Sequence, residues 1–480
     1  MKNTKIVATI GPASDKEEVI EQMILNGANV FRLNFSHGSH EYHKQNLEKI
    51  RAISKKLERK VGILQDISGP KIRVCALEKP YELKKGDRLD FYKDKSKAEI
   101  LDTNHYKVST NYSEAFSLVK EGEKIYLCDG SIKVSVCKLH DDFVECVVEN
   151  DGVLSSNKGI NFPDTKINID VITDKDEKDI SFGIENDVDF IAISFVQNAH
   201  DMEEVREIIK QSGKNIKIFA KIEKFDAVEN IDEILEASDG IMVARGDLGI
   251  EVPYCRVPSI QKQIIKKANE KAKPVITATQ MLFSLTNSLT ATRAEISDVA
   301  NAVLDGTDAV MLSEESAVGI NPANAVMIMS QTISQTEQIY PFYKLNQELK
   351  TKWDTIINAT AQLTKDLNAD AIICLTTSGA SAISISKARP KAKIITISHN
   401  SKVLDELSIV WGLNDFAVIQ ECENLHELIS NAIKALNLKG LIDLNKTYIL
   451  TAGHPVGKAG STNLIRVLSK EQLEYYLNFN

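Results

Sequence analysis

Residues 241–249 read I-M-V-A-R-G-D-L-G, an apolar strand that breaks into R-G-D at 245–247. Upstream of it, a second apolar strand ends in K-I-E at 221–223. Strands this apolar are typical of parallel sheets that helices cover on both faces, and such sheets carry their chemistry at the carboxyl ends of the strands. We therefore expect Glu223 and Asp247 to be neighbours across the mouth of a site.

Two carboxylates with open positions suit Mg²⁺, which binds one or two protein carboxylates and completes its shell with water and phosphate. We interpret Glu223 and Asp247 as the candidate ligands of such an ion. The alternative is that both carboxylates only cap the helices that follow their strands.

Length and composition limit the function. A chain of 480 residues is expected to form about three domains. The net charge of −9, with scattered Lys and Arg, argues against a nucleic-acid partner. No apolar run is long enough for a membrane span or a signal sequence, so we expect a soluble cytoplasmic protein without a membrane partner. The 7 cysteines show no C-x-x-C spacing and fall mostly in apolar strands, as reduced core residues do.

Strands and helices alternate along residues 1–69 and again along residues 168–342. Together the two segments contain the eight βα units of a (β/α)₈ TIM barrel. The expected strands are 5–10, 30–35, 61–67, 190–195, 216–223, 240–245, 274–279 and 308–313. The alternative is an open doubly wound sheet, which needs a reversal of strand order that no sequence feature marks.

Residues 70–167 change character, with short strands rich in Val, Ile, Tyr and Phe between glycine turns. They predict a small β-barrel domain inserted after the third barrel strand, where it overhangs the catalytic face as a hinged lid. Residues 343–480 resume the βα alternation and predict a C-terminal α/β domain. The expected fold class is therefore α/β, with three domains.

Eight motifs recur together over the whole chain. They are K-I-V-A-T-I-G-P-A-S at 5–14, R-L-N-F-S-H-G at 32–38, G-P-K-I-R at 69–73, K-G-I-N-F-P at 158–163, A-K-I-E at 220–223, I-M-V-A-R-G-D-L-G at 241–249, K-P-V-I-T-A-T-Q-M-L at 273–282 and T-R-A-E-I-S-D-V-A-N-A-V at 292–303. In these motifs and in their order the chain resembles the pyruvate kinase family from end to end.

The resemblance implies that phosphoenolpyruvate gives its phosphoryl group to ADP, leaving an enolate that is protonated to pyruvate. This is the last step of glycolysis, and it also produces ATP. Such a transfer asks the protein mainly for positioning and for neutralisation of negative charge. The resemblance further implies dependence on Mg²⁺, with Mn²⁺ as a substitute, and assembly into a homotetramer.

The resemblance also assigns catalytic and substrate-binding residues. Lys221 matches the family's transition-state lysine, which faces the transferring phosphoryl group and the enolate oxygen. Arg32 matches an arginine that reaches phosphate, and Asp247 belongs to both the metal and the substrate site. Gly246 lets backbone amides approach the substrate carboxylate. Thr279 is expected to orient the substrate or a water, because an unperturbed hydroxyl is a poor proton donor.

The resemblance implies a nucleotide site and a monovalent cation site. Arg73, Lys158 and His37 match residues that contact ADP or ATP, Lys158 from the lid. The set that matches a K⁺ site comprises Asn34, Ser36, Asp66 and the carbonyl of Ile67.

Members of the family that need K⁺ carry glutamate at one nearby position, and members that do not need it carry lysine. This chain carries Lys71 at that position. An ammonium can supply the charge that K⁺ brings, so we expect little dependence on K⁺.

A loop in the C-terminal domain has the character of an anion nest between a strand and a helix. Its residues are Thr376, Thr377, Ser378, Gly379 and Ser381. The resemblance implies a sugar-phosphate or nucleotide effector there, with residues 451–453 and the 457–463 loop as the second wall. Some members carry lysine where this chain has Thr377, so bisphosphate binding is in question unless Lys458 on the second wall replaces that charge. The alternative is a polar helix cap.

Two other functions are compatible with a metal-binding barrel. One is an aldolase-like enzyme that acts on pyruvate or its enolate, but Arg73 and Lys158 indicate a nucleotide clamp that an aldolase does not need. The other is a catalytically silent scaffold, which loss of Lys221, Glu223 or Asp247 would indicate, and all three residues are present.

Overall fold

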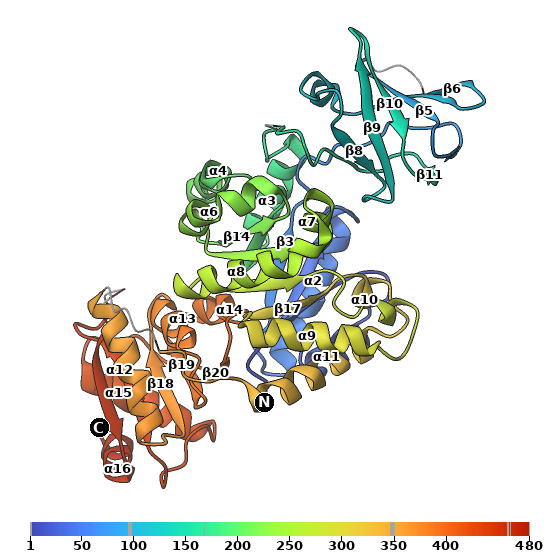
Figure 1. The fold of residues 1–480 in the computed structure, drawn as a ribbon. Coiled ribbons are helices and arrows are strands. Elements are labelled where there is room, and N and C mark those ends of the chain that lie inside the picture. Colours follow the sequence, from blue (N-terminus) through green and yellow to red (C-terminus); the bar gives the residue numbers. More distant parts are fainter. Residues whose placement is uncertain are drawn as a thin grey trace.

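The computed structural model describes residues 2–94, 98–167, 169–345, 351–457, 460 and 462–479. Within them a closed parallel barrel runs in the order β1-β17-β16-β15-β14-β13-β3-β2 (Figure 1). Its strands are β1 Lys5–Thr9, β2 Val30–Asn34, β3 Gly62–Asp66, β13 Phe190–Ile193, β14 Lys217–Ile222, β15 Gly240–Ala244, β16 Val275–Ala278 and β17 Ala309–Leu312. Because β1 pairs with both β2 and β17, the predicted (β/α)₈ barrel is confirmed and the open sheet is excluded.

Helices surround the barrel on the outside (Figure 1). Some of them begin at polar side chains that accept hydrogen bonds from free helix amides; Thr173 and Thr292 do so in complete capping boxes. The helices are α1 Glu17–Asn26, α2 His40–Lys56, α3 Asp174–Glu185, α4 Ala199–Gln211, α5 Phe225–Glu229, α6 Ile231–Ala237, α7 Arg245–Glu251, α8 Val257–Glu270, α9 Arg293–Asp305, α10 Glu314–Ala317 and α11 Pro322–Thr336. Short 3₁₀ turns span Ser113–Ser117, Tyr254–Arg256, Phe283–Thr286 and Glu337–Ile339.

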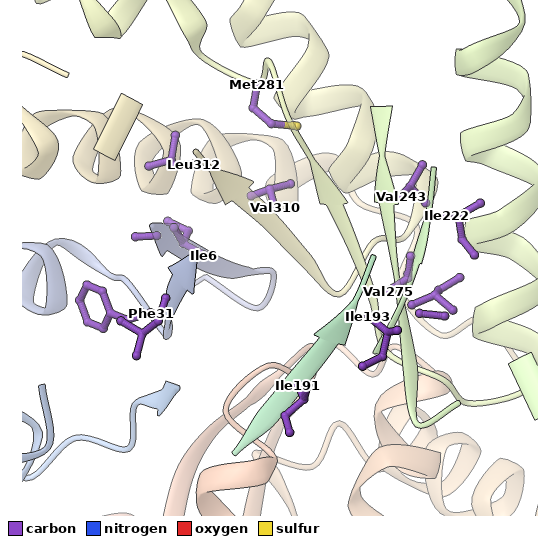
Figure 2. Packing of buried hydrophobic residues seen from close by; sticks show 14 of the residues in the cluster. Ile6, Phe31, Ile191, Ile193, Ile222, Val243, Val275, Met281, Val310 and Leu312 are labelled. Carbon is purple, nitrogen blue, oxygen red and sulfur yellow. The ribbon is translucent and has the colours of Figure 1, made fainter. Parts of the chain in front are cut away.

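Successive side chains of a strand point to opposite faces, so each barrel strand contributes side chains to two apolar cores. Ile191 and Ile193 pack in the layer between strands and helices, where Figure 2 shows them. Phe190 and Ala192, from the same strand, pack in the other cluster, with residues of neighbouring barrel strands such as Phe219. This alternation decides which side chains enter the barrel mouth.

The inserted segment follows β3 and lies beyond the barrel, at the opposite end from the C-terminal domain (Figure 1). Its strands form a seven-stranded sheet, β12-β8-β9-β10-β5-β7-β6, and a two-stranded sheet, β11-β4. The expected small β-barrel is not closed among the described residues, because the edge strands β12 and β6 do not pair with each other. The bounds are β4 Tyr81–Leu83, β5 Arg88–Tyr92, β6 Glu99–Asp102, β7 His105–Ser109, β8 Lys124–Leu127, β9 Ile132–Leu139, β10 Phe143–Val148, β11 Gly152–Leu154 and β12 Ile160–Asn161. It has an apolar core of its own.

The C-terminal sheet runs β20-β19-β18-β21-β22, with only β22 antiparallel to its neighbour. Its elements are α12 Lys352–Asp366, β18 Ala371–Leu375, α13 Ala380–Lys387, β19 Lys393–Ser398, α14 Ser401–Glu406, β20 Leu413–Val418, α15 Leu425–Leu438, β21 Tyr448–Gly453, β22 Thr462–Leu468 and α16 Lys470–Asn478. It contacts the amino ends of the barrel strands: Lys5 Nζ donates to the Leu413 carbonyl (2.6 Å), and Arg389 pairs with Asp308 (2.9 Å). The inserted domain lies at the other end of the barrel, where the barrel strands have their carboxyl ends.

Among the described residues, none of the helices has the length and apolar character that crossing a membrane requires. All seven cysteines are free thiols. The expectation of core cysteines is correct for Cys146, Cys374 and Cys422, which are buried, and wrong for Cys137 and Cys255, which are exposed.

Candidate active site

Three site residues enter the barrel mouth because each stands two positions after an inward-facing apolar residue. Val30, Leu64 and Phe219 belong to the same inner cluster. Two residues further along each strand stand Arg32, Asp66 and Lys221. The alternation along the three strands thus directs two cationic side chains and one carboxylate into the mouth of the barrel.

Asp66 joins the two cations. Its Oδ2 lies 2.6 Å from Nε of Arg32, and its Oδ1 lies 3.0 Å from Nζ of Lys221. The side chain of Asp66 is 1% exposed. Burial alone would raise the pKa of Asp66, but Arg32 and Lys221 lower it by more, so the net shift is downward and the carboxylate stays ionised.

Lys221 is enclosed by acceptors. Its Nζ lies 2.9 Å from Oε1 of Glu223 and donates to Oγ of Ser194 at 2.7 Å. Burial lowers the pKa of Lys221, but the carboxylates of Asp66 and Glu223 raise it by more, and the net pKa lies above the ordinary value. The ammonium is therefore kept charged and aimed by three partners.

The pKa of Glu223 is raised, in contrast to that of Asp66. Burial raises its pKa, and the charge of Asp247 raises it further, although Lys221 acts in the opposite direction. Its Oε2 accepts the amide of Phe195 at 3.0 Å. Neither α5 nor α7 has a side-chain cap, so the structure does not support the alternative in which Glu223 and Asp247 are helix caps.

The Glu223–Asp247 pair fits a hard divalent cation. Two neighbouring carboxylates repel each other, and a cation between them removes this cost. The described residues contain no cluster of three or more His, Cys, Asp or Glu arranged for a metal. Two protein ligands with the remaining positions open is the arrangement that suits Mg²⁺.

Thr279 and Gly246 lie in contact at the ends of neighbouring strands. The Gly246 amide donates to Oγ1 of Thr279 at 2.7 Å, and that hydroxyl donates to the Ala278 carbonyl at 2.6 Å. Thr279 has φ of 70°, a left-handed conformation that is rare for a β-branched residue and typical of functional sites. The Gly246 amide, one of the backbone amides expected to approach the substrate carboxylate, is therefore bonded to Thr279 in this structure.

Arg245 is a site residue that sequence reasoning missed. Its guanidinium makes a two-pronged contact with both oxygens of Asp298, each at 2.7 Å, and donates to the Thr279 carbonyl at 2.8 Å. It therefore holds the strained turn in place. Its only sequence signal was its position between the apolar strand and Gly246, because Asp298 is distant in the chain.

The predicted K⁺ ligands come from two segments of the chain that meet at the ends of β2 and β3, where Asn34 is the register partner of Asp66, but several of them are already engaged. Asp66 holds Arg32 and Lys221, the Ile67 carbonyl accepts from Oγ of Ser194 at 2.7 Å, and Oδ1 of Asn34 accepts the Ser36 amide at 3.2 Å.

The contacts of two lysines are relevant to the expected independence of K⁺. Lys175, which the sequence analysis did not identify, donates from Nζ to the Phe35 carbonyl between Asn34 and Ser36, at 2.8 Å. The Lys71 ammonium pairs with Asp129 of the inserted domain at 3.3 Å.

The predicted nucleotide residues fall into two groups. Arg73 forms a bridge with Gly159 and donates to the Asn157 carbonyl at 2.9 Å, so it lies beside Lys158 at the base of the inserted domain. Lys158 is exposed. His37 is exposed on the barrel, just after β2.

The predicted effector loop lines a cavity in the C-terminal domain. Gly379, with φ of 84°, donates its amide to Oγ1 of Thr376 at 2.9 Å, and Oγ of Ser381 is 2.6 Å from Oγ1 of Thr462 on the second wall. Lys458 lies outside the described residues. The described lining contains no Lys or Arg and includes the acidic Glu421.

The fold and the cluster at its mouth define a (β/α)₈-barrel enzyme for an anionic substrate. The family model for the pyruvate kinase barrel domain matches residues 1–326, and the model for the pyruvate kinase alpha/beta domain matches residues 354–468. The chain belongs to the pyruvate kinase family, whose members are phosphoryl-transferring enzymes.

Comparison with individual relatives supports the same family. The chain is 42% identical to a pyruvate kinase of Staphylococcus epidermidis in an alignment of 480 positions that covers 97% of this chain and 80% of the relative. A pyruvate kinase of Staphylococcus aureus is 42% identical over 475 residues, with the same coverage. The crystal structure of a pyruvate kinase from Cryptosporidium parvum superposes with a TM-score of 0.90 at 38% identity, over 98% of this chain and 96% of that chain. These relatives support the kinase over the aldolase-like alternative.

Proposed function

We propose that the chain transfers the phosphoryl group of phosphoenolpyruvate to ADP, giving pyruvate and ATP through an enolate, as the last step of glycolysis. The observation that carries the proposal is the Lys221 ammonium. It is held by Asp66, Glu223 and Ser194 with its pKa raised, at the mouth of a barrel whose relatives are pyruvate kinases. A fixed positive charge of this kind stabilises a transferring phosphoryl group and a developing enolate oxygen.

The neighbouring residues provide positioning. Arg32, fixed by Asp66, is proposed to bind the phosphate of phosphoenolpyruvate. Thr279 and Gly246 are proposed to receive and orient the substrate, exchanging their mutual hydrogen bond for contacts with it. Thr279 orients rather than donates a proton, because its hydroxyl already donates to a backbone carbonyl.

Glu223 and Asp247 are the proposed ligands of Mg²⁺, for which Mn²⁺ would substitute. The ion would neutralise substrate phosphate and polarise the oxygens of the substrate. The raised pKa of Glu223 supports this, since burial and Asp247 oppose its charge by more than Lys221 favours it, and a divalent cation would offset the difference. The protein contributes the two carboxylates and the Phe195 amide that holds Glu223 in orientation.

Arg73, Lys158 and His37 are the proposed nucleotide residues. The first two stand at the base of the inserted domain and the third on the barrel. A nucleotide held by all three would bridge the two domains, as expected for a lid. The proposed domain limits are 1–69 with 168–342 for the barrel, 70–167 for the lid and 343–480 for the C-terminal domain.

The K⁺ requirement is proposed to be weak. Lys175, which pairs with Asp179, also donates to the Phe35 carbonyl, and Asp66 is shared by two cations, so protein cations already engage oxygen atoms around Asn34, Ser36, Asp66 and Ile67. Lys71 stands at the position that divides the family. Its contact with the exposed Asp129 is of the kind that contributes little, so its ammonium is free to turn toward bound substrates.

The C-terminal cavity is the proposed effector site, built from Thr376, Thr377, Ser378, Gly379 and Ser381. Its described walls have hydroxyls but no Lys or Arg, which favours a ligand with one phosphate, such as a nucleotide or a sugar monophosphate, over a bisphosphate. The assembly is proposed to be a homotetramer that works in the cytoplasm, where glycolysis takes place.

A coupled assay tests the proposal. Pyruvate formation is measured from phosphoenolpyruvate and ADP in the presence of Mg²⁺, and omission of each component should abolish it. Turnover by the unmodified protein in the range of about 1–1000 per second is expected of an active enzyme. Absence of pyruvate formation would refute the proposed function and leave the scaffold alternative.

A further inference from the structure

Helix α7 is fixed to the barrel at its first residues. Arg245 binds Asp298 of α9 and the Thr279 carbonyl, and the next amide, of Gly246, binds the Thr279 hydroxyl. Asp247 follows directly. The start of this seven-residue helix therefore belongs to the proposed substrate and metal site.

The last residues of the same helix contact the inserted domain. Oε1 of Glu251 accepts a hydrogen bond from Nδ2 of Asn161 at 3.1 Å. Asn161 lies in β12, which pairs with β8 of the inserted sheet. One residue before Glu251, the side chain of Ile250 faces Gly130, with carbons 3.7 Å from the position that a Cβ on this glycine would take. One short helix thus connects the inserted domain to the proposed site.

The Asn161–Glu251 bond is a specific contact rather than an incidental one. Both residues line a single cavity at the junction of the two domains. Glu251 is half-buried, and this burial raises the pKa of its carboxyl group. Oδ1 of Asn161 is buried without a hydrogen-bond partner among the described residues, so the bond to Glu251 is the one that orients this amide.

We propose that Glu251 is a positioning residue: through Asn161 it couples the placement of the inserted domain to α7, and through α7 to Gly246 and Asp247. The inference rests on the proposed function for the roles of those two residues. A helix of about two turns is rigid, so a displacement at Glu251 is transmitted to its first residues. A bond at one end then determines how well the other end is aligned for catalysis.

A double-mutant cycle tests the coupling. Glu251→Ala and Asn161→Ala should each lower kcat about tenfold, or about 1.4 kcal/mol, while KM for ADP changes by less than about twofold. The double variant should lie within about twofold of either single variant, because all three lack the same bond. Glu251→Gln keeps an acceptor oxygen and should retain kcat within about threefold. The proposal would be overturned if the losses in kcat of the two single variants multiplied in the double variant. It would also be overturned if Glu251→Gln lowered kcat as much as Glu251→Ala.

A matched control is Glu236→Ala, which removes a carboxylate from α6 that is 72% exposed and pairs with Lys271 away from the site. It should leave kcat unchanged. A second measurement does not depend on activity: hydrogen exchange of the α7 amides should be at least about threefold faster in Asn161→Ala and unchanged in Glu236→Ala. Unchanged hydrogen exchange in Asn161→Ala would refute the coupling, whether or not the unmodified protein forms pyruvate. Absence of pyruvate formation by the unmodified protein would refute only the proposed function.

Discussion

Lys221 and Asp66 lie on strands separated by β13, yet Nζ of the lysine is 3.0 Å from Oδ1 of the aspartate, whose other oxygen holds Arg32. One buried carboxylate therefore orients both cations of the proposed site. The cations in turn lower the pKa of Asp66 below its usual range and keep it charged, despite the burial that opposes its charge. This mutual dependence makes the cluster a preorganised electrostatic unit.

Replacing Lys221 with methionine should lower kcat at least about a thousandfold and leave KM for phosphoenolpyruvate nearly unchanged, since a charge aimed at the transferring group acts mainly in the transition state. Steady-state kinetics with varied phosphoenolpyruvate measure both quantities. Lys217→Met is the control, because Lys217 lies on the same strand about 13 Å away and pairs with Glu406. Near-normal turnover of Lys221→Met would remove this lysine from the mechanism.

Glu223→Gln and Asp247→Asn should each raise the Mg²⁺ concentration for half-maximal activity and lower the maximal rate, because each removes one of two proposed protein ligands. Titration of activity with Mg²⁺ and with Mn²⁺ measures the shift. Asp232→Asn, which changes an exposed carboxylate on α6, is the matched control. If both site variants titrate like the unmodified protein, the ion binds elsewhere.

Removal of K⁺ should leave most of the activity, since Lys175 places an ammonium at the Phe35 carbonyl and Lys71 is proposed to turn from Asp129 toward bound substrates. Lys71→Glu should create a requirement for K⁺ by adding an acidic group. Initial rates in tetramethylammonium buffer, with and without K⁺, measure both effects. Activation of the unmodified protein by more than about tenfold, or about 1.4 kcal/mol, would contradict the assignment.

Arg245→Met should lower kcat about tenfold to a hundredfold, because the strained Thr279 turn loses the guanidinium that holds its carbonyl. Asp298→Asn should have a smaller effect in the same direction, since one oxygen acceptor remains. The combined variant should be no worse than Arg245→Met alone. Additive losses in kcat would show that the two residues act independently of each other.

Arg389→Met should destabilise the protein by about 3–5 kcal/mol, because it leaves Asp308 buried without its cation between the barrel and the C-terminal domain. Adding Asp308→Asn should recover part of this loss. Urea unfolding followed by tryptophan fluorescence is a suitable measurement, since Arg389 lies over the Trp411 ring. A change below about 1 kcal/mol, the usual size for surface positions, would rule out this role for the pair.

Local sequence determined the architecture. The strands of the barrel were predictable to within two residues at each end, because continuous apolar segments between helical segments can only form strands covered on both faces. The positions of Lys221, Glu223 and Asp247 at strand ends followed from the same pattern, as did the change to a β domain after Gly69 and Pro70. The two carboxylates were sufficient to predict a metal site, whereas the role of Lys221 toward phosphate was predicted only from the resemblance to a known family.

Tertiary structure decided which groups hold these side chains in place. Ser194, Arg245 and Lys175 contact the site through Lys221, Thr279 and the Phe35 carbonyl, and no local pattern marks them. Asp66 was predicted only as a K⁺ ligand, whereas the fold makes it the partner of both cations. Hydrogen bonds and ion pairs depend on distances of about 3 Å between atoms. Barrel closure and the inserted domain set those distances between residues far apart in the chain, so apolar periodicity predicts the framework but not the contacts within it.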